Sequence, residues 1–448
     1  MTYNFDKIVS RKGTNAVKTD MLKTVFGKSD LIPLWVADMD FETPPFIIDA
    51  LRSRLEHPVL GYTVTSPTFF PSIVKWMKDR HNWDISAEWL SFVPGVVHGI
   101  ALVLEYFTKK GDKIVIQPPV YHPFRLVPQE TGREVVYNPL RCKAAYDHSL
   151  CNSQIASAET DLHCKPIATN VCSNDYYEMD FENLESILDE RCKVLLLSNP
   201  HNPAGIVWKK ETLRQLAEIC AKHNVLVVSD EIHSDLPLFG NRHTPFATVS
   251  EQARCNSITL HAPSKTFNIA GMNSSFYIIP DDKLRIPFYK HLRANEHNSA
   301  PFLSIIAAEA AFAHGNEWRE QLIKYLEDNV TFVAQFIERE IPQIKVIPPQ
   351  ASFLIWLDCR ELGLRQKELV DLFVNKAGLA LNDGEIFGVC DDSSGDNGSS
   401  DSSGNSSNNS SSSNSIGNCG TGFMRLNIGC PRTTLEKALT QLRAAILA

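Results

Sequence analysis

The chain has 448 residues, 43% of them hydrophobic, which is enough to build a large core in two or three domains. Its formal net charge of −8 gives no support for nucleic-acid binding, which usually shows as a basic patch or stripe. No apolar run approaches the roughly 20 residues that span a bilayer, and the charged N-terminus lacks the apolar stretch of a secretion signal, so we expect a soluble cytoplasmic protein that binds no membrane.

The first chemically suggestive element lies after residue 90. In the run SFVPGVVHGIALVLEYF (91–107), Gly95 opens an amphipathic helix, and the first N–H groups of a helix have no partner within it. The N–H groups near Val96 and Val97 are therefore a candidate phosphate site. No Gly-Lys-Ser/Thr follows Gly95, so a nucleotide P-loop is not supported. No GxGxxG motif follows an early strand, which argues against a nicotinamide-dependent dehydrogenase.

Short apolar and β-branched runs alternate with helical patterns up to about residue 280. The runs lie at 113–117, 134–138, 193–198, 224–230, 257–262 and 275–279. Continuous apolar runs of this length are typical of strands buried on both faces. Between two of them, residues 211–224 carry apolar side chains at helical spacing. The alternation predicts an α/β fold, with a mostly parallel sheet and helices on both faces.

Two of these strands end in polar residues. The loop SNPHNPAG places Asn202 after the run at 193–198, where its amide could donate to a ring oxygen of a cofactor, although turn formation explains the same residues. Asp230 ends the run at 224–230, at the edge where open α/β sheets bind ligands. A carboxylate there could keep a pyridine nitrogen protonated, or it could cap the next helix.

A lysine follows the fifth run. In HAPSKTFNIAG, Lys265 comes after a strand and a turn of small residues. A lysine amine in a protected, partly desolvated site can form a Schiff base with a carbonyl cofactor. Most lysines are solvated surface groups, so this residue gains weight only together with Asp230.

After residue 290 the pattern changes to a second, smaller α+β domain. A long helical pattern covers 316–340, the stretch 344–359 predicts a pair of strands, and a helix at 434–447 closes the chain. Within this domain Arg425 lies in the apolar run GFMRLNIGCPR. A buried guanidinium needs a partner, and its planar fork suits a substrate carboxylate, although a structural ion pair is the alternative.

Two segments do not fit a compact fold. Residues 391–420 are almost entirely Ser, Asn, Gly and Asp, which indicates a flexible insert. Residues 142–178 form a second, mixed insertion that contains Cys142, Cys151, Cys164, Cys172, His148 and His163. Their spacing matches no zinc pattern. We interpret the cysteines as reduced thiols in a surface loop and predict no metal site.

The order and spacing of these motifs resemble the class I/II aminotransferase family of fold-type I enzymes, which use pyridoxal 5′-phosphate (PLP). Four stretches resemble its cystathionine β-lyase/C–S lyase branch: NFDKIVSRKGTNAVKTD, LIPLWVADMDFETP, SDEIHSD and SKTFNIAG. The resemblance implies a large PLP-binding domain at 50–290. It also implies a small domain made of 1–49 and 291–448, and a homodimer with shared active sites.

The resemblance also implies a role for each motif residue. Lys265 becomes the Schiff-base lysine and proton carrier, Asp230 pairs with the pyridine nitrogen, and Asn202 bonds the ring oxygen. Tyr121, in PPVYHPF, stacks on the ring and borders the substrate. Arg425 binds the substrate carboxylate with help from the backbone at Ala37. Tyr62, in LGYT, reaches the phosphate of the neighbouring subunit.

The chain departs from many aminotransferases at two positions. His233 replaces the tyrosine that often follows the aspartate by three residues, as is common in the lyase branch. Ala262 replaces a serine that often binds phosphate before the lysine, so Ser264 is the nearest hydroxyl.

The expected activity is cleavage of the Cβ–S bond of cystathionine, cysteine or a cysteine S-conjugate to pyruvate, ammonia and a thiol. A PLP-dependent aminotransferase acting on an L-amino acid and a 2-oxo acid is the alternative, because fold and cofactor do not separate the two. A regulatory binding protein on the same scaffold is a third possibility. The sequence identifies no second charged anchor for the distal end of a substrate.

Overall fold

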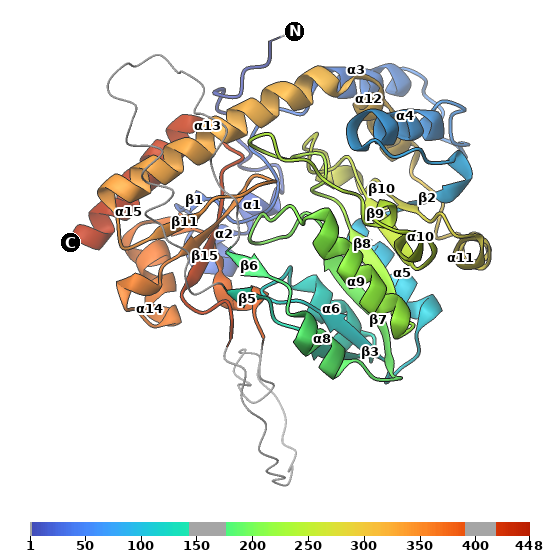
Figure 1. Ribbon diagram of the computed structural model, residues 1–448. Helices are drawn as coiled ribbons and strands as arrows, with labels where there is room; N and C mark the ends of the chain where they lie inside the picture. Colours follow the sequence, from blue (N-terminus) through green and yellow to red (C-terminus); the bar gives the residue numbers. More distant parts are fainter. Residues whose placement is uncertain (1, 143–175, 390–417) are drawn as a thin grey trace, which may run out of the picture.

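The structure is a computed structural model that describes residues 2–142, 176–389 and 418–448. A seven-stranded sheet forms the centre of its larger part (Figure 1). The strand order is β2-β10-β9-β8-β7-β3-β4, with bounds β2 Leu90–Val93, β3 Lys113–Ile116, β4 Glu134–Tyr137, β7 Cys192–Ser198, β8 Leu226–Asp230, β9 Ser257–His261 and β10 Ser275–Ile278. Strands from β9 to β4 pair in parallel, whereas β10 is antiparallel to both β9 and β2.

The predicted α/β fold with a mostly parallel sheet is confirmed, and each predicted run forms one of these strands. The sequence does not predict β2, because its four residues lead straight into the turn and helix of the candidate phosphate site. Helices cover both faces of the sheet: α5 Val96–Phe107, α6 Pro123–Glu130 and α11 Asp282–Ala294 on one, and α8 Phe181–Ile187, α9 Lys210–Lys222 and α10 Glu251–Cys255 on the other. Alternation along β3 explains this: Ile114 and Ile116 pack with α5, whereas Val115 packs with α9.

A smaller antiparallel sheet has the order β11-β12-β15-β14. Its bounds are β11 Lys345–Ile347, β12 Leu354–Asp358, β14 Asn382–Asp383 and β15 Phe423–Asn427, and the predicted strand pair in 344–359 is β11 and β12. Three helices accompany it: α13 Asn316–Glu340, α14 Gln366–Asp371 and α15 Arg432–Leu447. In Figure 1, α13 and α15 lie along one side of the small sheet.

The N-terminal segment packs against this C-terminal part. After α1 Val17–Asp20 and α2 Leu22–Phe26, strand β1 Ile32–Pro33 pairs in parallel with β13 Leu379–Ala380. On this basis we propose the domain division expected from the sequence, 50–290 against 1–49 and 291–448. Helix α12 Phe302–His314 packs against both α3 Pro45–Leu55 and α4 Phe69–His81.

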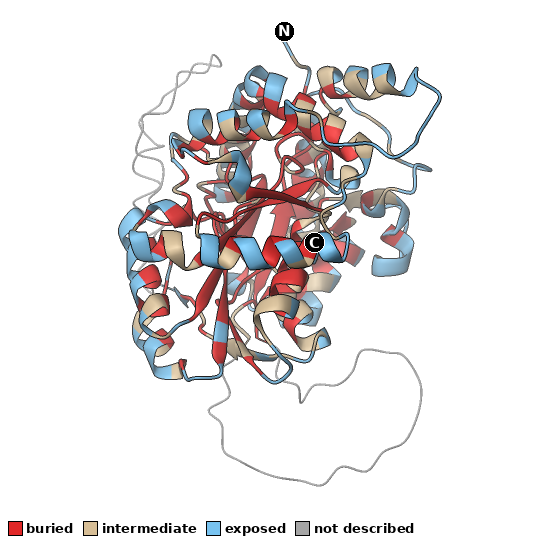
Figure 2. Cartoon of the chain, turned by 90° about the vertical axis from the view of Figure 1, so that its right-hand side faces the viewer, coloured by how far each residue is buried: buried red, intermediate tan, exposed pale blue. Residues whose placement is uncertain are grey.

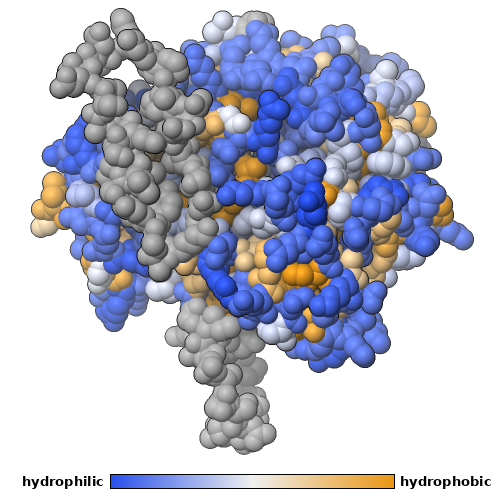
Figure 3. Space-filling model, in the orientation of Figure 1, coloured by the Kyte–Doolittle hydropathy of each residue, from blue (hydrophilic) through white to orange (hydrophobic). Residues whose placement is uncertain are grey.

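Buried residues concentrate in the strands and on the inner faces of the helices around them (Figure 2). Hydrophilic side chains cover most of the face shown in Figure 3. Among the described residues, no helix is both long and apolar enough to cross a bilayer.

The two predicted inserts fall largely outside the described residues. The short strands β5 Arg141–Cys142 and β6 Tyr177–Glu178 pair at the two ends of the first insert. Cys142 carries an exposed free thiol, and the other cysteines and histidines of that predicted cluster lie outside the described residues. The second insert lies between the 3₁₀ helix Gly384–Phe387 and β15, and only its last residues are described.

Candidate active site

A cavity of about 290 Å³ lies at the carboxyl ends of the parallel strands. Nine of the residues singled out in the sequence line it: Ala37, Val96, Val97, Tyr121, Asn202, Asp230, His233, Ser264 and Lys265. They come from loops that follow different strands and from the start of α5, so the sheet brings distant parts of the chain to one edge. Arg425 lies directly behind this lining, because its Nη1 contacts Asn202.

Lys265 points into the cavity from the loop after β9. Its Nζ donates a 2.6 Å hydrogen bond to the Ala37 carbonyl, and it forms no ion pair with any described carboxylate. Burial, together with the nearby positive charge of Arg425, lowers the pKa of Lys265 to about 8. About half of the amine is therefore neutral at pH 8, and the neutral form is the one that acts as a nucleophile or proton acceptor.

Asp230 ends β8, is buried and lines the cavity. Its Oδ1 accepts one hydrogen bond, 3.1 Å long, from the Ile232 backbone. Burial raises the pKa of Asp230 to about 6, since no cation pairs with it among the described residues. A protonated pyridine nitrogen would supply the missing counter-charge, so this residue fits the expected cofactor.

Arg425, on β15, is only 4% exposed. Its guanidinium donates to three neutral oxygens: Asn202 Oδ1 at 3.0 Å, the Trp35 carbonyl at 3.0 Å and Asn382 Oδ1 at 2.6 Å. Its Nε has no partner among the described residues. Burial lowers the pKa of Arg425 to about 10. The structural ion pair considered from the sequence is thus not found in the described part of the chain, and the guanidinium lies behind Asn202 with neutral hydrogen-bond partners only.

Asn202 links the arginine to the cofactor site. Because its Oδ1 accepts from Arg425, its Nδ2 is directed elsewhere and stays available as a donor, which suits a bond to a cofactor ring oxygen. The Asn202 carbonyl accepts a 3.1 Å hydrogen bond from the Tyr121 backbone N–H, so the loops that carry these two residues are joined to each other.

The part of the cavity lined by the start of α5 suits a phosphate. Gly95 has a φ of 102°, a left-handed conformation that favours glycine, and it turns the chain into α5 so that the N–H groups of Val96 and Val97 face outward from the helix start. Ser264 lines the cavity, whereas Ala262 is fully buried and does not. Asn273, Ser274 and Ser275 also line the cavity, and no recognisable motif marks them, because they lie just before and at the first residue of β10.

Two other predicted residues differ sharply in position. His233 is buried beside the cavity, and its Nδ1 lies 3.0 Å from Ser352 Oγ. Burial, followed by the charges of Lys265 and Arg425, holds the pKa of His233 well below its usual range. Tyr62 does not line the cavity and is fully exposed in a single chain.

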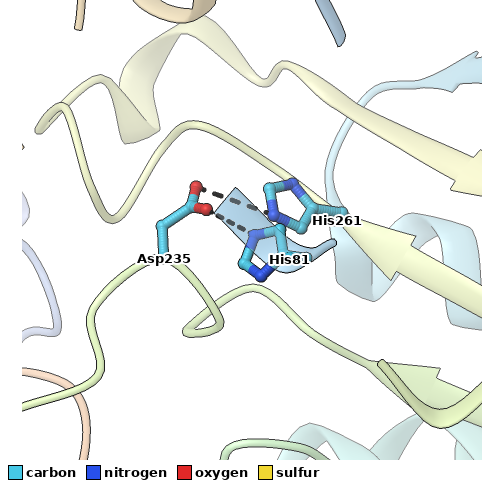
Figure 4. Close-up of side chains that lie close together, drawn as sticks. All are labelled: His81, Asp235 and His261. Carbon is cyan, nitrogen blue, oxygen red and sulfur yellow. Dashed lines mark hydrogen bonds and ion pairs between the residues drawn. The ribbon is translucent and has the colours of Figure 1, made fainter. Parts of the chain in front are cut away.

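A buried group that sequence reasoning missed lies behind the lysine loop (Figure 4). Asp235 Oδ1 accepts from His81 Nε2 and Trp76 Nε1, both at 2.8 Å, while Oδ2 lies 3.4 Å from Thr266 Oγ1 and 3.6 Å from His261 Nε2. Burial alone would raise the pKa of Asp235, but the two histidines outweigh it and hold that pKa well below its usual range. Since protein donors already occupy the carboxylate, we interpret the cluster as a brace for the loop of Lys265 and not as a metal site.

Comparison with known proteins agrees with this geometry. The family model for aminotransferase class I and II matches residues 29–174 and 153–442. Cystathionine β-lyase PatB of Bacillus subtilis is 38% identical over 444 residues, covering 99% of this chain and 100% of that protein. Cystalysin from Treponema denticola, whose crystal structure contains PLP, superposes with a TM-score of 0.82 at 32% identity, covering 100% of this chain and 99% of that one.

The PLP-bound C–S lyase from Staphylococcus hominis gives a TM-score of 0.78 at 30% identity, covering 100% of this chain and 99% of that one. Fold, cofactor-site geometry and these full-length similarities agree with one another. The chain therefore belongs to the aminotransferase class I and II family, as a PLP-dependent enzyme of its cystathionine β-lyase/C–S lyase branch.

Proposed function

We propose that the enzyme is a C–S β-lyase that converts cystathionine, cysteine or a related cysteine S-conjugate, with water, to pyruvate, ammonia and a thiol. The observation that carries the proposal is the full-length similarity to a cystathionine β-lyase and to C–S lyases. The site supports it, because a buried amine, a buried carboxylate and a buried guanidinium each lack an ionic partner among the described residues.

Lys265 and Arg425 would handle the substrate. The Arg425 guanidinium binds the substrate's α-carboxylate. The carboxylate then takes the place of neutral oxygen acceptors, and its negative charge compensates the positive charge of the buried guanidinium. Bound PLP supplies an electron-withdrawing ring that makes the substrate's α-proton acidic. The neutral amine of Lys265 then accepts that proton, and the Ala37 carbonyl lies within 2.6 Å to hold the ammonium that results.

The other residues would hold the cofactor. Asp230 keeps the pyridine nitrogen protonated, and Asn202 donates to the ring oxygen. Tyr121 lines the cavity and would stack on the ring, and burial raises its pKa, so its hydroxyl stays neutral. The N–H groups of Val96 and Val97, with Ser264, would bind the phosphate, and neutral His233, which also lines the cavity, would add no charge there.

The leaving group favours elimination over amino transfer. A thiolate on Cβ departs far more readily than hydroxide or a carbon group, so loss of the α-proton is followed by C–S cleavage. An aminotransferase would instead have to return the proton at the cofactor and then admit a 2-oxo acid. The proposal is tested by incubating the enzyme with cystathionine, cysteine and an amino acid–oxo acid pair while pyruvate, thiol and amino transfer are measured separately.

Replacing Arg425 by alanine is expected to weaken substrate capture by roughly 2–4 kcal/mol, which lowers kcat/KM by roughly 30- to 900-fold, mainly through KM. Arg425→Lys should recover only part of this, because an ammonium cannot form the two parallel bonds of a guanidinium. Arg365→Ala, which changes an arginine that is 84% exposed, is the control. An unchanged KM of Arg425→Ala in steady-state kinetics would contradict a role of Arg425 in substrate binding.

We also propose a homodimer in which Tyr62 reaches the phosphate of the neighbouring subunit. Tyr62 lies in the irregular stretch 58–66, where Val59, Leu60 and Val64 are also exposed. Such clustered apolar side chains favour burial against a partner. Sedimentation at assay concentration should show a dimer, and Tyr62→Ala should weaken PLP affinity. A fully active monomer would contradict the proposal.

A further inference from the structure

One lysine in the N-terminal segment is completely buried. Lys18, in α1, has an exposed fraction of 0%, which is rare for a lysine because an unpaired buried ammonium is costly. Its Nζ donates to Asp40 Oδ2 at 2.9 Å and to the Asp38 carbonyl at 3.2 Å. Its own carbonyl accepts from the Trp35 indole at 3.0 Å. Lys18 therefore holds the loop 35–40 at both of its ends.

Arg11 completes a group of two cations and two carboxylates. Its guanidinium bonds both oxygens of Asp38, at 2.9 and 2.6 Å, and its Nη1 also lies 3.1 Å from Asp40 Oδ1. The hydrogen bond to Asp38 raises the pKa of Arg11 above its ordinary value. The charges of the four side chains cancel, and Asp38 and Asp40 are only 18% and 17% exposed, so the group is well shielded from water.

The loop held in this way contacts both reacting ends of the active site. The Ala37 carbonyl accepts from Lys265, and the Trp35 carbonyl accepts from Arg425. Asn427 ties the same loop to β15 by donating to the carbonyls of Val36 and Asp38 at 2.5 and 2.7 Å. A displacement of this loop would therefore move the acceptors of Lys265 and Arg425 together.

We propose that Lys18 is a positioning residue that, with Arg11, fixes the loop 35–40 so that its carbonyl oxygens aim the amine of Lys265 and the guanidinium of Arg425. The inference rests on the roles proposed for Lys265 and Arg425 and not on which reaction the enzyme catalyses. It gives a function to the N-terminal motif NFDKIVSRKGTNAVKTD, which otherwise makes no contact with the cavity. A misplacement of about 1 Å can cost about 100-fold in rate.

The test compares Lys18→Met with Lys7→Met. Lys7 lies in the same segment and pairs with Glu42, but that pair is about half exposed and does not touch the loop 35–40. Three quantities are measured: the rate at which the cofactor-free protein captures PLP, followed by absorbance; kcat and KM separately; and the melting temperature. In Lys18→Met we expect PLP capture and kcat to fall at least about 10-fold and KM to rise, at a temperature where the variant is still folded. Lys7→Met should match the wild type.

A Lys18→Met protein that melts earlier but captures PLP and turns over like the wild type would overturn the proposal, since Lys18 would then only stabilise the fold. If Lys18→Met does not fold, Asp40→Ala decides, because it removes the carboxylate that both Lys18 and Arg11 bond while it leaves both cations in place. A fall in PLP capture and in kcat supports the proposal, and wild-type values overturn it. Borohydride labelling of the wild type shows independently whether Lys265 carries the cofactor.

Discussion

Lys265→Ala is expected to lower pyruvate formation by at least about 10⁴-fold at saturating substrate, because one side chain supplies both the attachment point of the cofactor and the general base, and a general base alone contributes roughly 10²–10⁴-fold. Lys222→Ala, which removes a lysine that is 65% exposed, is the matched control and should leave turnover unchanged. Borohydride reduction of the wild type followed by peptide mass spectrometry should place the label on Lys265. A label on another lysine would contradict the assignment.

The same residue predicts a pH dependence. Only the neutral amine attacks the PLP aldehyde, so the rate of PLP capture by the cofactor-free protein should rise with pH as Lys265 loses its proton. Burial and Arg425 lower the pKa of that amine from 10.5 to about 8, so the rate should be half-maximal near pH 8 and level off about one pH unit higher. A rate that keeps rising to pH 10 would show an ordinary, solvated lysine.

Asp230→Asn is expected to have opposite effects on activity and stability. An asparagine cannot keep the pyridine nitrogen protonated, so kcat should fall by roughly 10²–10³-fold, as for loss of other electrostatic partners. In the cofactor-free protein, however, burial raises the pKa of Asp230 to about 6. The folded state therefore binds this proton more tightly than the unfolded state, and stability falls as pH rises from about 4 to about 6. Above pH 6 the buried negative charge of Asp230 destabilises the folded state, and an asparagine removes this charge.

The cofactor-free Asp230→Asn protein should accordingly melt at a higher temperature than the wild type at pH 7.5. Glu231→Gln is the matched control, because the adjacent carboxylate is also buried but accepts from His243 Nε2 and Ser229 Oγ at 2.8 Å. Its removal should lower the melting temperature. Equal melting shifts of the same sign in both variants would show that Asp230 is an ordinary buried structural carboxylate.

The parts of the fold that the sequence predicts are those with a local signal. The strands of the large sheet are apolar runs that end in turn residues, and α13 follows from a helical pattern predicted at 316–340. Asn202, Asp230 and Lys265 could be found because each lies at the end of a predicted strand or in the short loop after it. Strand β2 was missed because four residues give too short a pattern to separate from the helix that follows.

The rest depends on contacts between distant segments. The partners of Arg425 come from Trp35, Asn202 and Asn382, and no spacing within the chain relates these positions. The cluster of His81, Asp235 and His261 is formed by three separate elements for the same reason. The burial of Lys18 could not be predicted either, since a lysine in a charged N-terminal segment is ordinarily solvated.

The proposed activity depends most directly on one measurement: pyruvate released from cystathionine by the purified, PLP-loaded enzyme with no 2-oxo acid added. A β-lyase needs no second substrate, so pyruvate, ammonia and thiol should accumulate together in equal amounts and continue through many turnovers. Addition of a 2-oxo acid should not raise the rate. If pyruvate and thiol are absent while amino transfer to an added 2-oxo acid is fast, the enzyme is an aminotransferase and the C–S lyase assignment is wrong.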